Sequence, residues 1–225
     1  MGQKSSRLLQ PFVSTSSPKV RKVEKTVNRA RKGDPWKKYN TVPLVWIDVE
    51  TTGLVPEKDI ILEIAMVVTD GDLNQLGSSQ SLVISHRPSE LAKLNEWSKK
   101  WHSKSGLLDD VAKSTLTLRE AEERLLEQVT QYCKRPNRAI LAGNNVGFDR
   151  MFISRHMPVL AGYLHFRNID VSSINELAKR WRPDELKGLR KKFSHRAIDD
   201  INESIRELKY YKETMFDRPE GQEAE

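Results

Sequence analysis

Three apolar segments rich in β-branched residues open the central part of the chain. They cover residues 43–50, 61–69 and 80–85, and turn-forming residues such as Gly53 and Gly77 separate them. Short apolar runs bounded by such residues are typical of buried strands joined by short connections. The pattern therefore predicts a three-stranded antiparallel meander.

A helical pattern follows the third strand. One helical stretch opens near Ser89 and runs past Trp97 and Trp101. The clearest helix begins at Thr117, where Thr117 and Glu120 form a capping box. Apolar residues follow it at helical spacing: Leu118, Ala121, Leu125, Val129 and Tyr132. The sequence therefore predicts helical structure in both segments, with a well-defined start at Thr117.

The rest of the chain alternates between short apolar runs and helical periods. We expect strands at 139–142 and 168–171, and helices at 149–157, 172–180 and 196–211. Strands and helices arranged in this way indicate a mixed α/β fold. This domain is expected to span residues 41–216, between a disordered basic extension at 1–40 and a flexible end at 217–225.

The positive charge of the chain is concentrated in the extension. Residues 1–40 hold eleven Lys and Arg against two acidic residues, a net charge of +9, whereas the whole chain carries +7. The remainder therefore carries −2. The isoelectric point of about 9.4 is a property of the extension, so it does not by itself indicate a basic nucleic-acid groove on the folded domain.

The extension also resembles a targeting segment. Its first 23 residues contain no acidic residue and several Arg, Lys and Ser, a composition typical of mitochondrial transit peptides. Met1–Ser6 fits the N-myristoylation pattern as well, and basic runs at 19–25 and 29–32 fit nuclear targeting or RNA binding. We favour mitochondrial import, with cytoplasmic and nuclear locations as alternatives.

Cysteine content and hydropathy narrow the class of protein further. The single cysteine, Cys133, excludes an intramolecular disulfide and favours a reducing compartment, and we expect it to be a small buried apolar side chain. The longest apolar runs, 60–62 and 64–68, are far too short to span a membrane. We therefore expect a protein without a membrane span.

Candidate chemistry begins at the end of the first strand. Asp48 and Glu50 lie two residues apart, so both carboxylates are expected on one face of the strand, within reach of one cation. Trp46 shares that face and Ile47 lies on the other, which indicates a strand buried on both faces. Buried carboxylates need a partner, although a strand end that meets solvent is the alternative.

Two further acidic positions lie near helix starts. Asp149 follows the short strand at 139–142, where an aspartate taken alone is more often a helix N-cap than a metal ligand. Asp200 lies five residues after His195 in the first turns of the last helix, where acidic residues also suit the helix dipole. Asp199 is expected to interact favourably with the helix dipole in this way.

Together these positions give the order Asp-x-Glu, Asp, His-x-x-x-x-Asp. This order resembles the histidine subclass of the four-acid exonuclease superfamily, whose core is a ribonuclease-H-like mixed sheet flanked by helices. The resemblance to the oligoribonuclease family is closer and covers residues 43–216. Besides Trp97, it is carried by the segments Leu44–Leu54, His102–Leu107, Ile169–Ser172, Glu176–Trp181 and His195–Ser204.

The resemblance implies a 3′-to-5′ exoribonuclease that cleaves short single-stranded RNA, especially dinucleotides, to 5′-mononucleotides. It implies two divalent ions, Mg²⁺ or Mn²⁺, since hard oxygen ligands suit both. Asp48 would bridge the two ions, and Glu50, Asp149 and Asp200 would complete their ligands. His195 would be the general base, because an imidazole has a pKa suited to that task.

The resemblance also implies a substrate pocket and a homodimer. Leu54 matches an apolar wedge between two bases, and Trp97 and His102 match pocket residues. Arg167 and Ser172 match a cap on the 5′ phosphate, which the partner subunit supplies in this family.

Two pocket positions depart from the family pattern. Asn145 stands where the family has Ser, and Phe166 where it has Tyr. Phenylalanine can still stack on a base but loses the hydroxyl, and asparagine can still donate to a phosphate. A broader 3′-to-5′ exonuclease acting on longer RNA or DNA is therefore an alternative. A catalytically silent nucleic-acid-binding module is another, although all five catalytic positions are filled. For Trp101 and Trp181 we expect packing under a helix or at a dimer interface.

Overall fold

The computed structural model describes residues 42–92, 94–189 and 196–216. The basic extension at 1–40, the end at 217–225 and His195 lie outside the described residues. None of the described helices combines the length and the hydrophobicity that a membrane span requires.

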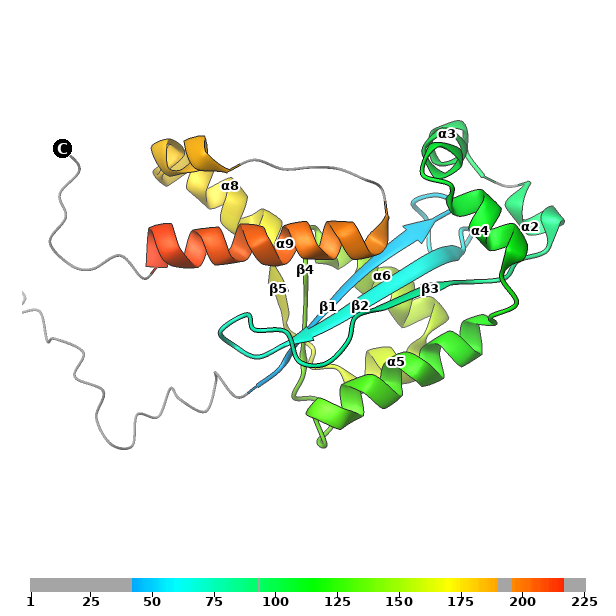
Figure 1. The fold of residues 1–225 in the computed structure, drawn as a ribbon, viewed down its shortest axis with the longest axis horizontal. Helices are drawn as coiled ribbons and strands as arrows, with labels where there is room; N and C mark the ends of the chain where they lie inside the picture. Colours follow the sequence, from blue (N-terminus) through cyan, green and yellow to red (C-terminus); the bar gives the residue numbers. More distant parts are fainter. Residues whose placement is uncertain (1–41, 93, 190–195, 217–225) are drawn as a thin grey trace, which may run out of the picture. The chain divides into compact units, whose positions relative to one another are not determined.

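A five-stranded mixed sheet forms the centre of the fold (Figure 1). Its strands are β1 (Leu44–Thr51), β2 (Ile61–Thr69), β3 (Gln80–Val83), β4 (Ile140–Gly143) and β5 (Asn168–Asp170). The spatial order is β3-β2-β1-β4-β5. β1 pairs antiparallel with β2, β2 antiparallel with β3, β1 parallel with β4, and β4 parallel with β5. The predicted meander and the α/β class are confirmed, although β3 is shorter than expected.

Helices cover both faces of the sheet. Val45 and Ile47 of β1 share one buried cluster with side chains of α5 (Leu118–Tyr132), α6 (Val146–His156) and α7 (Pro158–Tyr163). Leu44 and Trp46 share the other with α8 (Val171–Trp181) and α9 (Ala197–Tyr211). Since burying one large apolar side chain contributes roughly 1.5–3 kcal/mol, these two layers fix β1 in the middle of the core.

The region after β3 differs from the prediction of one helical stretch. It forms three short helices, α2 (Pro88–Leu91), α3 (Glu96–Lys104) and α4 (Leu107–Lys113). The side chain of Asn95 accepts a hydrogen bond from Ser98 N at 2.8 Å and starts a new helix there. Gly106 has φ = 77°, a left-handed conformation that ends α3 and lets the chain turn into α4.

Helix α5 begins as predicted. Thr117 Oγ1 accepts a hydrogen bond from Glu120 N at 3.2 Å, and Glu120 Oε2 accepts one from Thr117 N at 2.8 Å. This reciprocal capping box satisfies two backbone donors at the helix start. Cys133, at the end of α5, is buried as expected.

Three other features of the helical regions were not predicted. α7 is a short helix that begins at Pro158, and the 3₁₀ helix η1 covers Pro183–Gly188. The π-helical turn η2 (Lys212–Phe216) extends α9. Trp181 is 70% exposed, so it does not pack under a helix of its own chain, and its packing at a dimer interface stays a prediction. Trp101 is half-buried, with its ring centroid 6.3 Å from that of Trp97.

A buried polar network ties the last helix to the strand end at β4. The Glu207 carboxylate on α9 accepts hydrogen bonds from Asn144 Nδ2 at 3.1 Å, Asn175 Nδ2 at 3.2 Å and the Tyr211 hydroxyl at 2.5 Å. Asn144 follows β4 and Asn175 lies on α8, so one carboxylate joins three elements. A buried charge with several donors of this kind is stabilised by them, and the network holds the loop after β4 in place.

Candidate active site

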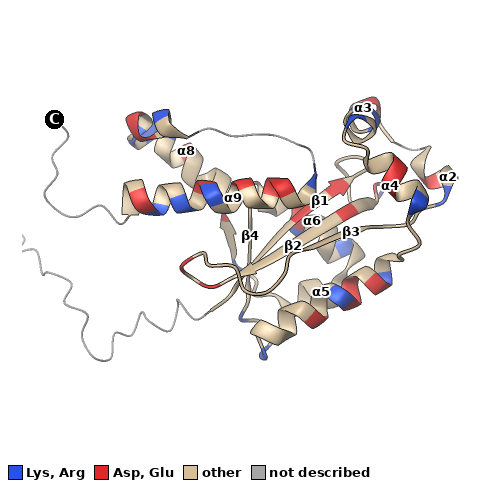
Figure 2. Ribbon diagram, viewed as in Figure 1, with Lys and Arg blue, Asp and Glu red and all other residues tan. Residues whose placement is uncertain are grey.

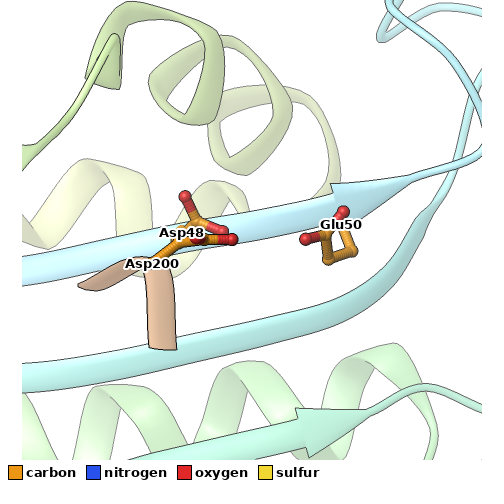
Figure 3. Close-up of side chains that lie close together, drawn as sticks. All are labelled: Asp48, Glu50 and Asp200. Atoms are coloured by element: carbon orange, nitrogen blue, oxygen red, sulfur yellow. The ribbon is translucent and has the colours of Figure 1, made fainter. Parts of the chain in front are cut away.

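Three carboxylates meet on the α9 face of the sheet. Asp48 and Glu50 project from the same side of β1, and Asp200 approaches from the first turn of α9 (Figure 3). One oxygen from each lies within 4.8 Å of the others. Trp46, on the same face, and Ile47, on the opposite face, are both buried. The strand is thus covered on both sides, as the sequence indicated.

Asp149 reaches the same strand from the opposite layer. β4 pairs with β1 only as far as Trp46↔Ala142. Beyond that point Asp149 Oδ1 accepts a hydrogen bond from Val49 N at 3.0 Å. The N-cap position of α6 is Asn145, in a left-handed conformation, so the capping explanation for Asp149 is wrong. Asp149 is buried beside the cluster but is not one of the three residues whose oxygens lie within 4.8 Å of one another.

Burial raises the pKa of all four carboxyl groups, and repulsion by neighbouring carboxylates adds to the increase. Burial raises the pKa of Glu50 to about 8, and the charges of Asp200, Glu63 and Asp149 add to the increase. Burial likewise raises the pKa of Asp149 to about 7 and that of Asp200 to about 6. The Asp48 pKa lies well above its usual range because of burial and then the repulsion of Asp149 and Glu50. Four acidic groups held together at this cost favour a cation between them.

A basic residue that the sequence motifs did not single out, Arg196, lies beside this cluster. Glu63 on β2 lies directly across the strand pair from Glu50 and is fully buried. Arg196 donates to it from Nε at 3.1 Å and from Nη2 at 3.2 Å. A glutamate inside the otherwise apolar run Ile61–Val68 was the available signal, since a buried charge requires a partner.

His102 lies on the other side of Glu50. Its Nε2 is 2.9 Å from the Thr51 carbonyl oxygen, and its Nδ1 is 3.7 Å from Glu50 Oε2. A carbonyl oxygen only accepts hydrogen bonds, so Nε2 carries a proton and Nδ1 faces the carboxylate. The predicted pocket residue His102 is therefore a buried neighbour of the acidic cluster.

A cavity of about 220 Å³ opens beside Glu50. Four of the predicted substrate residues line it: Leu54, Trp97, His102 and Asn145. Phe148 and Ser98 also line it and were not singled out from the sequence. Leu54 and Trp97 are 72% and 59% exposed, so two large apolar side chains stand at an open cavity next to the acidic cluster.

The loop that carries Leu54 is held by Asp59. Its carboxylate accepts hydrogen bonds from Thr52 Oγ1 at 3.0 Å and from Val55 N at 2.9 Å. A Cβ at Gly53 would lie 2.5 Å from Asp59 Oδ1, so the close approach of this carboxylate requires glycine there. Leu54 is therefore exposed on a constrained loop.

The other predicted substrate residues lie away from this cavity. Phe166 is 76% exposed and stacks on His165, with ring centroids 4.4 Å apart, while the Arg167 guanidinium lies 4.8 Å from the Phe166 ring. Ser172 donates to Asp170 Oδ1 at 2.7 Å at the start of α8. None of the three residues lines the cavity within this chain.

Comparisons with known proteins identify the family of this chain. The Exonuclease (RNase_T) family model matches residues 45–208. The oligoribonuclease of Chromobacterium violaceum is 47% identical over 175 residues, which cover 77% of this chain and 96% of that protein. This chain belongs to the oligoribonuclease family. The resemblance identified from the sequence motifs is therefore confirmed.

Solved structures agree with the fold. Exonuclease I from Methylocaldum szegediense has a TM-score of 0.54 at 19% identity and covers 77% of this chain, which spans only 41% of that longer protein. Pop2p of S. pombe, solved in a Mg²⁺- and Mn²⁺-bound form, has a TM-score of 0.61 at 15% identity and covers 81% of this chain and 86% of its own. The ribonuclease-H-like α/β fold is thus confirmed. As a member of the oligoribonuclease family with an exonuclease domain, the chain is a nuclease, and its acidic cluster fits a divalent metal ion.

Proposed function

We propose that this oligoribonuclease-family chain is a 3′-to-5′ exoribonuclease. It hydrolyses short single-stranded RNA, especially dinucleotides, to 5′-mononucleotides with two divalent ions, Mg²⁺ or Mn²⁺. The observation that carries the proposal is the cluster of Asp48, Glu50 and Asp200, whose oxygens lie within 4.8 Å of one another beside the open cavity.

The residues fit divalent metal ions. Asp48, Glu50, Asp149 and Asp200 supply hard carboxylate oxygens, which both Mg²⁺ and Mn²⁺ prefer. Their raised pKa values mean that the charged forms are costly without a cation. When bound at a site of this kind, two divalent ions help to generate the nucleophile and stabilise the leaving 3′ oxygen.

The chain's own residues supply proton transfer and substrate contacts. By family resemblance His195 accepts the proton of the attacking water, a step that suits an imidazole. Trp97 offers an aromatic face on which a base can stack, and Leu54 stands where an apolar side chain can enter between two bases. His102, held by the Thr51 carbonyl, forms the wall of the cavity next to Glu50.

The 5′ phosphate is bound by a second subunit in this proposal. Arg167 and Ser172 lie away from the cavity of their own chain, which agrees with a contribution to the site of a partner. Leu177 and Trp181, one helical turn apart on α8, are 43% and 70% exposed and offer an apolar surface for a homodimer. An arginine suits a terminal phosphate because it donates two parallel charged hydrogen bonds.

Subunit mixing tests this arrangement. Asp48→Ala and Arg167→Ala homodimers should each be inactive on dinucleotides. Random mixing should restore about a quarter of the wild-type activity per subunit, because half the dimers then hold one intact site. Mixtures that stay inactive although the subunits exchange would refute a cap supplied by the partner.

The direction and length preference are tested with 5′-end-labelled RNA. Products should shorten by one nucleotide at a time from the 3′ end, and the rate on dinucleotides should exceed that on RNA of five or twenty nucleotides. Equal rates at all lengths would favour the alternative, a broader 3′-to-5′ exonuclease, which the departures Asn145 and Phe166 make the second candidate. Binding without hydrolysis would instead favour a silent nucleic-acid-binding module.

We further propose mitochondrial import through residues 1–40. The absence of acidic residues before Glu24 supports a transit peptide. N-terminal sequencing of the native protein should find a start well beyond Gly2. An intact, acylated Gly2 would instead identify the myristoylation pattern as the one that is used.

A further inference from the structure

A charged bridge joins three elements next to the acidic cluster. Glu63 lies on β2, Asp110 on α4 and Arg196 immediately before α9. The Arg196 guanidinium donates from Nε and Nη2 to Glu63 and from Nη1 to Asp110 Oδ2 at 2.9 Å. Figure 2 shows basic and acidic segments together at this end of α9. One side chain therefore fixes the start of α9 to both the sheet and α4.

The buried end of the bridge is fully hydrogen-bonded. Glu63 accepts a third hydrogen bond, from Ser81 Oγ on β3 at 2.7 Å, and its side chain is fully buried, whereas that of Arg196 is 28% exposed. Two carboxylates directly opposite each other on antiparallel strands repel each other, and Glu63 is directly opposite Glu50. Arg196 supplies the compensating charge: Glu63 raises the pKa of Glu50, and Arg196 lowers it.

The backbone of Arg196 leads directly to a proposed metal ligand. Arg196 is the N-cap residue of α9, and its carbonyl oxygen accepts hydrogen bonds from Asp199 N at 2.9 Å and from Asp200 N at 3.2 Å. The residue whose guanidinium forms the bridge thus also begins the first turn of α9. None of the bridge residues lines the substrate cavity, so the effect of the bridge on the site passes through Asp200 and Glu50.

We propose that Arg196 is a positioning residue of the metal site: by pairing with Glu63 and Asp110 it holds Asp200 against Asp48 and Glu50. The inference rests on the proposed function, since it takes these carboxylates as metal ligands. Replacing a residue that orients metal ligands in this way typically lowers metal affinity or activity by roughly 10- to 100-fold.

The test is a double-mutant cycle with two readouts. Arg196→Met, Glu63→Gln and the double variant are titrated with Mn²⁺ alone, by the loss of the free-ion resonance signal, and then assayed on a dinucleotide with Mn²⁺. Arg196→Met should weaken Mn²⁺ binding by at least roughly 10-fold and lower kcat by a similar factor. The KM for the dinucleotide should change much less, because the cavity is untouched.

The double variant separates positioning from general stability. It removes the lone buried charge that Arg196→Met leaves behind, so its Mn²⁺ affinity should be no weaker than that of Arg196→Met, and the two single effects should not add. Arg196→Lys keeps the charge but cannot donate in parallel to Glu63 and reach Asp110, and its affinity should lie between those of wild type and Arg196→Met.

Arg206→Met is the matched control. It removes the same charge from within α9, where Arg206 pairs with Glu203 on the surface, and should leave Mn²⁺ affinity and kcat unchanged. Additive losses in the cycle, or wild-type Mn²⁺ affinity in Arg196→Met, would overturn the proposal. If Arg196→Met fails to fold, Arg196→Lys decides, because a Mn²⁺ affinity equal to that of wild type in this variant would overturn the proposal. Because Mn²⁺ binding is measured without RNA, the result stands apart from whether the chain hydrolyses RNA.

Discussion

Replacing Glu50 by glutamine should stabilise the metal-free protein while abolishing its metal-dependent activity. The Glu50 side chain is 14% exposed, and its pKa rises from 4.5 to about 8, first through burial and then through neighbouring carboxylates. At pH 7 an unfolded chain ionises this group, whereas the folded protein keeps it largely protonated. This difference in ionisation lowers the free energy of unfolding by up to roughly 3 kcal/mol. An uncharged amide of the same shape avoids this loss.

Thermal unfolding in EDTA measures this effect. For a domain of this size, 3 kcal/mol corresponds to an increase of roughly 6–12 °C in Tm. Glu127→Gln is the matched control, because Glu127 is exposed on α5, and its Tm should equal that of wild type. A Glu50→Gln protein no more stable than Glu127→Gln at pH 7 would show that the cluster is not strained as described.

The raised pKa of Glu50 also predicts how the stability difference between Glu50→Gln and wild type changes with pH. A carboxyl group whose pKa is raised in the folded state favours folding only while it is protonated, so its contribution is lost as pH rises through the folded pKa. The stability difference between Glu50→Gln and wild type should therefore be small near pH 4 and grow up to about pH 8. Adding Mg²⁺ or Mn²⁺ should stabilise wild type more than the variant, and more so at the upper end of that range.

Three further substitutions separate the substrate pocket from the scaffold. Leu54→Ala should raise the KM for a dinucleotide by roughly 10- to 100-fold, the value of one buried leucine side chain, with a smaller change in kcat; an unchanged KM would exclude a wedge. Phe152→Ala removes a fully buried ring and should lower the free energy of unfolding by roughly 3–5 kcal/mol in urea titrations; a loss below 1 kcal/mol would contradict the packing described. Thr117→Ala should cost about 1 kcal/mol through loss of the capping box and leave turnover unchanged; a drop in turnover would place α5 in the catalytic mechanism.

The sequence predicted those parts of the fold that depend on local patterns. Thr117 and Glu120 marked the start of α5 because capping is a contact between residues three apart, and the apolar runs around Trp46 marked the strands. The break between α3 and α4 was missed because the left-handed conformation of Gly106 has no unique signature in one sequence.

The order of acidic residues and histidine along the chain predicted the site. Contacts between site residues and partners far away in the sequence were not predicted. Asp149 taken alone favoured a helix cap, and only the structure shows that Asn145 takes that position while Asp149 reaches Val49. Glu63 and Arg196 are 133 residues apart, so nothing in the local sequence could pair them. A charged residue within an apolar strand did indicate that a partner was required, although not which one.

The central claim is that the carboxylates around Asp48, with His195, hydrolyse short RNA from its 3′ end. The most direct measurement compares mononucleotide release from a 5′-phosphorylated dinucleotide by wild type, Asp48→Ala and His195→Ala, each with Mg²⁺ and each confirmed to be folded by circular dichroism. Wild type should release 5′-mononucleotides only when the metal ion is present, and both variants should release none above background. Turnover that persists in either folded variant would contradict the account.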